Sequence, residues 1–106
     1  MARALIRTPA LARIGDVAEI RVLLQHVMET GYRPGVDGQV IPRDIVTRME
    51  AHFEGQLVFA AELFPAIAAN PYIAFPMRVT GAGELLISFQ GDNGFAHRES
   101  AAIRLG

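Results

Sequence analysis

Alternation of apolar and polar residues is the feature of this sequence that most restricts its fold. It is clearest in residues 17–25, where apolar side chains occupy every second position and Glu19 and Arg21 stand between them. Successive side chains of a β-strand point to opposite faces, whereas a helix needs apolar residues three and four positions apart. The pattern therefore predicts a half-buried strand.

Similar short runs recur along the chain, separated by Gly, Pro, Asn and Asp turn signals. The ranges expected to form strands are 3–7, 17–25, 44–54, 57–61, 72–80, 84–90 and 95–105. Proline has no N–H to donate to a neighbouring strand, so the run that contains Pro76 should lie at a sheet edge or a bulge. Residues 63–71 are ambiguous, because their alanines favour a helix and the two prolines in the segment limit its length.

About seven short strands in a chain of 106 residues are typical of an antiparallel β-sandwich of the immunoglobulin-like type. A chain of this length is expected to be a single domain, residues 1–106. The all-β fold should bury the inward-facing members of its clearest strands, which are Ile20, Val22, Leu24, Phe53, Phe75, Val79, Ile87, Phe89 and Ile103. By the same parity we also expect Ile73, Ala101 and Leu105 to face inward.

The composition argues against several classes of protein. The chain has 10 Lys+Arg and 11 Asp+Glu residues, so it lacks the basic excess of a nucleic-acid-binding domain. It contains no Cys, which excludes disulfides, thiolate chemistry and sulfur-ligated metals. The longest apolar run, residues 63–69, is far shorter than the roughly 20 residues of a membrane span, and the first residues do not form a secretory signal.

No catalytic, metal-binding or cofactor-binding constellation is predicted. His26, His52 and His97 are far apart in the sequence and lack the spacing of a zinc site. Ser88 and Ser100 lie in predicted strands, without the Gly-x-Ser-x-Gly turn of a serine hydrolase. We therefore expect a binding or scaffold protein that is not an enzyme and needs no cofactor.

Residues 26–43 form an eighteen-residue segment rich in Gly and Pro, which predicts a long loop. Loops of this length inside a compact domain are usually functional. His26, Met28 and Tyr32 form an apolar and aromatic cluster in this loop. We interpret these three residues as candidate contacts with a partner, in preference to a loop packed only on itself.

Residues 63–71 are the second candidate for partner binding. The prolines that bracket this segment stiffen it, and a stiff segment loses little entropy when it docks. Phe64, Pro71 and Tyr72 are its candidate partner-binding residues. The alternative is that the segment only crosses between the sheets and closes one end of the sandwich, with Ile67 inside. The sequence leaves both open.

Three stretches of the sequence resemble the SoxZ family of sulfur-oxidation proteins. They are FAAELFPAIAANPYIAF at residues 59–75, HVMETG at 26–31 followed by IPR at 41–43, and FQGDNG at 89–94. The resemblance runs from about residue 10 to the C-terminus with the elements in the same order.

The resemblance implies an immunoglobulin-like sandwich that forms a heterodimer with a SoxY subunit in the periplasm. SoxY carries thiosulfate-derived sulfur on a cysteine in a flexible C-terminal Gly-Gly-Cys-Gly-Gly tail and presents it to the oxidation enzymes. SoxZ has no catalytic residue of its own and is exported together with its signal-bearing partner. The resemblance therefore implies a non-catalytic scaffold. From the charge balance and the short apolar runs, we expect it to bind neither nucleic acid nor membrane.

A free-standing immunoglobulin-like module for carbohydrate or a small molecule is the alternative. Carbohydrate-binding surfaces usually expose several aromatic side chains, and this chain has two Tyr and no Trp. A metal-dependent enzyme is a third and weaker reading.

Overall fold

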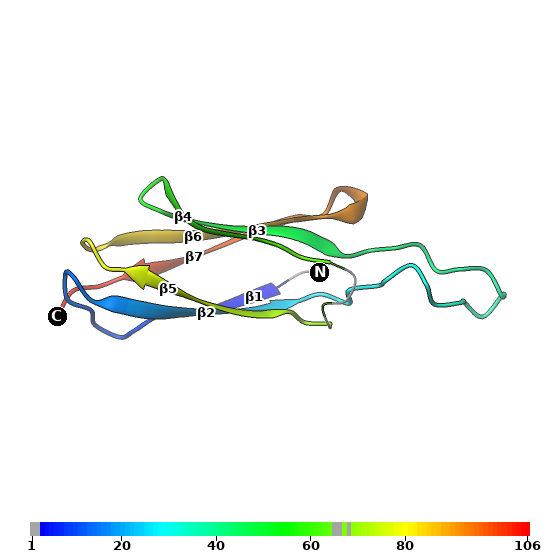
Figure 1. Ribbon diagram of the computed structural model, residues 1–106, viewed down its shortest axis with the longest axis horizontal. Helices are drawn as coiled ribbons and strands as arrows, with labels where there is room; N and C mark the ends of the chain where they lie inside the picture. The colour runs from blue at the N-terminus through cyan, green and yellow to red at the C-terminus, as the bar shows by residue number, and fades with distance from the viewer. Residues whose placement is uncertain (1–2, 65–66, 68) are drawn as a thin grey trace.

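The computed structural model describes residues 3–64, 67 and 69–106. Its strands form two antiparallel sheets that pack face to face (Figure 1). The smaller sheet has the order β1-β2-β5, with strands Arg3–Arg7, Val17–Gln25 and Tyr72–Arg78. The larger sheet has the order β4-β3-β6-β7, with strands Gln56–Glu62, Val46–Phe53, Gly83–Gly91 and Ala96–Ile103. The predicted antiparallel β-sandwich is confirmed.

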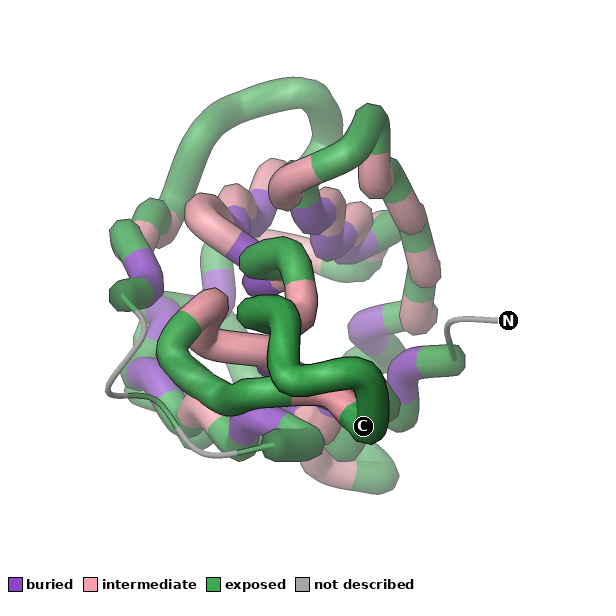
Figure 2. The backbone as a smooth tube through the Cα atoms, turned by 90° about the vertical axis from the view of Figure 1, so that its right-hand side faces the viewer, coloured by how far each residue is buried: buried purple, intermediate pink, exposed green. Residues whose placement is uncertain are grey.

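Apolar side chains from both sheets form one buried cluster between them. In Figure 2, buried positions occur along the strands of both sheets. The buried set includes every residue of the expected core: Ile20, Val22, Leu24, Phe53, Phe75, Val79, Ile87, Phe89 and Ile103. Each large apolar side chain removed from water contributes about 1.5–3 kcal/mol. The alternation in the sequence therefore supplies the interaction that holds the sheets together.

Alternation fails at a few positions near the ends of elements. Leu105, expected to face inward, is 40% exposed because β7 ends at Ile103. Ile67 is exposed as well, so it does not fill the interior of the sandwich as the closing-segment alternative required. Ile73 and Ala101 are only partly buried.

The start of β3 also departs from simple alternation, since the adjacent residues Ile45 and Val46 are both buried. The register of β3 against β6 shifts between Val46 and Arg48, as happens at a β-bulge. A Cβ atom added to Gly91 would lie 2.5 Å from the carbonyl oxygen of Ile45. Glycine at position 91 therefore allows the two backbones to approach closely beside the short 3-10 turn Asp92–Gly94, labelled η1.

Pro76 lies in β5, which is an edge strand of the smaller sheet, as the sequence predicts. On this side of the sandwich the rings of Phe59 and Phe75 stack 4.4 Å apart and connect β4 to β5. Within the described residues, no helix has the length and apolar character needed to cross a membrane.

Candidate partner-binding site

Residues 27–44, here called the arm, form a long loop that extends beyond both sheets (Figure 1), and two isolated β-bridges, Glu29 with Asp44 and Pro34 with Val40, join its two sides. Near its base, the N–H groups of Glu29 and Asp44 each donate to the other residue's carbonyl oxygen at 2.8 Å. Further out, the Ile41 N–H donates to the Arg33 carbonyl oxygen at 2.9 Å. The predicted loop is therefore a structured projection, and the molecule measures 57 × 21 × 19 Å.

The base of the arm is attached to the η1 turn through one carboxylate. The Arg43 guanidinium donates to both oxygens of Asp92, each at 2.8 Å, and the Ile45 N–H donates to Asp92 Oδ2 at 3.1 Å. The Asn93 side-chain amide donates in turn to the Arg43 carbonyl oxygen. Hydrogen bonds from Arg43 and from the Ile45 backbone favour the charged carboxylate, so they lower the pKa of Asp92.

His26 and Met28, two of the predicted partner contacts, lie inside the base of the arm. Met28 is 4% exposed, and its sulfur accepts a hydrogen bond from the Val46 N–H. The His26 side chain is 7% exposed, its Nδ1 accepts from the Met28 N–H at 3.0 Å, and its ring meets Phe95 edge-on. These two residues position the arm and present little surface to a partner.

Tyr32, the third predicted contact in this segment, is 80% exposed on the arm. Three valines of the arm are exposed as well: Val27, Val36 and Val40. Next to Tyr32 in the sequence, the Arg33 guanidinium donates a hydrogen bond to the Glu29 carboxylate. This bond favours the charged carboxylate and lowers the pKa of Glu29. The arm thus offers apolar side chains to solvent.

Tyr72 belongs to a second exposed apolar group, on the outer face of the smaller sheet. Leu5 lies opposite Leu23, and Leu23 lies opposite Tyr72, so the three side chains form one line across β1, β2 and β5. We call this line the apolar row. Tyr72 is 59% exposed, and Arg7 and Arg21 line the same shallow hollow.

Phe64 and Pro71, the remaining predicted contacts, lie in different surroundings. Phe64 follows β4 and is exposed at the end of the larger sheet. Pro71 is buried, and its carbonyl oxygen accepts a hydrogen bond from the Leu24 N–H. Asn70, beside it, exchanges two hydrogen bonds with the backbone of His26 and so joins this segment to the base of the arm. Pro65 lies outside the described residues.

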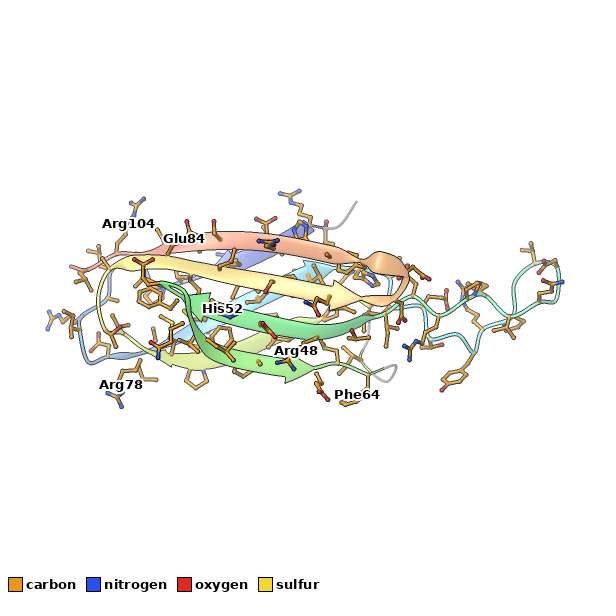
Figure 3. The ribbon with its side chains drawn as sticks, turned by 90° about the horizontal axis from the view of Figure 1, so that it is seen from above. Arg48, His52, Phe64, Arg78, Glu84 and Arg104 are labelled. Atoms are coloured by element: carbon orange, nitrogen blue, oxygen red, sulfur yellow. The ribbon has the colours of Figure 1, made fainter. Side chains whose placement is uncertain are left out.

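The outer face of the larger sheet is polar, and several of its charges are paired with each other. Figure 3 looks onto this face and shows Arg48 and His52 on β3. Arg48 donates to Glu50 at 2.7 Å, which lowers the pKa of Glu50, and His52 lies 3.9 Å from the same carboxylate. Across the described part of the chain, no three His, Cys, Asp or Glu side chains are placed to share a metal ion.

Sequence reasoning missed two members of the apolar row. Leu5 and Leu23 stand on the outward parity of their strands, where alternation predicts polar residues. These outward-facing leucines were therefore the signal in the sequence that could have indicated the apolar row. The strand order then brings Leu5 and Leu23 into line with Tyr72, which lies far away in the sequence.

Comparison with known families gives a match over residues 6–102 to the model of "Sulphur oxidation protein SoxZ". The chain belongs to the SoxZ family. This match covers nearly the whole chain and includes the arm, both sheets and the segment between β4 and β5. Membership of this family gives the protein a role in the Sox sulfur-oxidation system, to which the family contributes a carrier subunit. No curated protein sequence matches the chain.

Solved structures with the same fold include the sulfur carrier protein SoxY from Chlorobium limicola f thiosulfatophilum. It is 14% identical, with a TM-score of 0.68, and the match covers 97% of this chain and 78% of SoxY. Superoxide reductase (neelaredoxin) from Ignicoccus hospitalis is also 14% identical, with a TM-score of 0.72 and coverage of 97% and 80%. At these identities the likeness concerns the fold alone.

Proposed function

We propose that this SoxZ protein is the non-catalytic scaffold subunit of a SoxYZ-type sulfur carrier. Its partner is a SoxY-like subunit whose C-terminal cysteine holds thiosulfate-derived sulfur while oxidation enzymes act on it. The family match over residues 6–102 carries this proposal.

The chemistry of the chain supports this division of labour. Reversible attachment of sulfane sulfur needs a thiolate, and the sequence contains no Cys. The covalent adduct must therefore form on the partner, and this subunit must hold the partner through non-covalent contacts. We place the complex in the periplasm, with this chain exported together with a signal-bearing partner.

The surfaces described above are suited to holding a protein partner. Exposed tyrosines bury a large area with few rotatable bonds and are enriched where proteins meet. Tyr32 on the arm and Tyr72 in the apolar row are both of this kind, and Phe64 adds a third exposed aromatic ring.

Co-expression with the SoxY-like subunit followed by intact-mass spectrometry tests the proposal. The pair should copurify in the presence of a reducing agent, because no disulfide joins the subunits. After thiosulfate treatment, added mass should appear on the SoxY-like subunit only. Adduct mass on this chain, or a pair that separates on reduction, would overturn the proposal.

An activity assay on the free chain supplies the second test. It should show no turnover of thiosulfate, esters or glycosides. Activity that survives repurification and is lost on replacing His26, His52 or His97 by Ala would contradict a scaffold role.

A further inference from the structure

The outer face of the smaller sheet differs in charge from the rest of the molecule. Its outward positions carry four arginines, Arg3, Arg7, Arg21 and Arg78, and one acidic residue, Glu19. The whole chain has 10 Lys+Arg and 11 Asp+Glu residues, so this face concentrates positive charge. Of these four guanidinium groups, that of Arg21 is bonded to Glu19, at 2.6 Å, and that of Arg78 donates to the Gly15 carbonyl oxygen.

The arginines lie on both sides of the apolar row. Strand register places Arg7 and Arg21 opposite each other in the line next to Leu5 and Leu23, and Arg3 opposite Gln25 on the other side. An apolar centre with an arginine rim is the usual anatomy of a protein interface, in which Tyr and Arg are both enriched. The face thus has the composition of a protein interface.

We propose that this face, centred on Leu5, Leu23 and Tyr72, binds the SoxY-like subunit. The matching surface of that subunit would be an apolar patch surrounded by acidic residues. The inference rests on the proposed function and adds to it the surface used and the chemistry that the partner must present. The positive charge of this face carries the assignment, since four arginines and one glutamate at its outward positions favour an acidic counterpart.

The same charges argue against a second copy of this chain as the occupant. Two copies docked through this face would bring their arginine rims together, and like charges in contact cost several kcal/mol in an interface. The polar face of the larger sheet is a poorer site, because Arg48 and Glu50 already form an ion pair there.

Affinity of the purified pair, measured with matched variants, tests the inference. We expect Tyr72→Asp to weaken binding at least about tenfold, because it places a charge in the apolar centre, against the apolar patch of the partner. Arg7→Glu should slow association by about tenfold at low salt and flatten the salt dependence of the affinity. Both side chains are exposed, so thermal melting of the free variants should match that of the wild type.

Two controls separate this face from other surfaces. Arg98→Glu changes an exposed arginine on β7, which is an edge strand like β1, and should leave the affinity unchanged. Tyr32→Asp changes the exposed tyrosine of the arm and should have a smaller effect than Tyr72→Asp. A larger effect of Tyr32→Asp would make the arm the main docking surface and overturn the inference.

The outcomes distinguish this inference from the proposed function. No complex with the wild-type chain would contradict the proposed function itself. A complex whose dissociation constant is unchanged by Tyr72→Asp, by Arg7→Glu and by salt would support that function but overturn the docking face. The docking face is also overturned if such a complex forms while the free chain binds phosphatidylglycerol vesicles in an Arg7-dependent way, because the face would then serve a membrane.

Discussion

The guanidinium of Arg43 and the carboxylate of Asp92 meet through two parallel hydrogen bonds, each 2.8 Å long, across a sequence separation of 49 residues. The pair joins the arm to the turn between β6 and β7. Because Asp92 also accepts the Ile45 N–H, one side chain fixes both the arm and the start of β3. The orientation of the arm therefore depends on this geometry.

Arg43→Lys should loosen the arm although it keeps the charge. Lysine presents a single ammonium group and cannot reproduce the planar, two-point contact with Asp92. We expect faster amide hydrogen exchange at residues 27–44 and an unchanged rate in the sheets. Arg98→Lys, at an exposed position on β7, is the matched control and should change neither. Equal exchange in the two variants would mean that the pair does not order the arm.

The attachment of the arm should persist into moderately acidic solution. The pKa of Asp92 lies below its ordinary value, so its stabilising contribution is complete above about pH 3.9 and is lost as the pH falls through the lower folded value. Exchange at residues 27–44, corrected for its intrinsic pH dependence, should be constant between about pH 7 and 5. Asp92→Asn should abolish the acid-induced increase in amide hydrogen exchange of the arm. Loss of protection between about pH 7 and 5 would contradict the role assigned to Asp92.

Met28→Ala should destabilise the fold, whereas Tyr32→Ala should not. Met28 is buried against the start of β3, and removing a buried methionine side chain costs about 2–5 kcal/mol of unfolding free energy. Tyr32 is exposed on the arm, where substitutions usually change stability by less than about 0.5 kcal/mol. Urea unfolding of both variants measures the difference. Similar midpoints would show that Met28 is not part of the core.

Gly91→Ala should be strongly destabilising. Its Cβ would lie 2.5 Å from the Ile45 carbonyl oxygen and 3.1 Å from Val46 Cα, and both are backbone atoms that cannot move aside. Gly81→Ala serves as the control, because a Cβ there meets no atom within 4 Å. We expect a lower melting temperature for the first variant only. Normal stability of Gly91→Ala would mean that the bulge at the start of β3 adjusts freely.

Much of the fold could be predicted from the sequence because alternation is a local property. In β2, the residues Ile20, Val22 and Leu24 keep a strict period of two, and their burial follows from strand geometry. Prediction from alternation fails where a contact between residues far apart in the sequence breaks the period of two. Ile45 and Val46 are both buried because β3 shifts register against β6, which no short stretch of sequence records.

The candidate site was less predictable for the same reason. Aromatic character made Tyr32 and Tyr72 candidate partner contacts, and both rings are exposed, but the sequence could not tell that Met28 and Pro71 would be buried. The apolar row exists only after three separate strands are placed side by side. Its arginine rim likewise depends on register, since Arg7 and Arg21 meet across β1 and β2.

The projecting arm gives the chain more surface than its mass requires. A compact monomer of 11.5 kDa exposes about 5,800 Å² by the usual scaling with mass, whereas this chain exposes 6718 Å². The excess of about 900 Å² is close to the roughly 800 Å² that one protein contributes to a stable interface of standard size. The elongated shape therefore leaves the isolated chain with enough surface for the contact that the proposed SoxY-like partner requires.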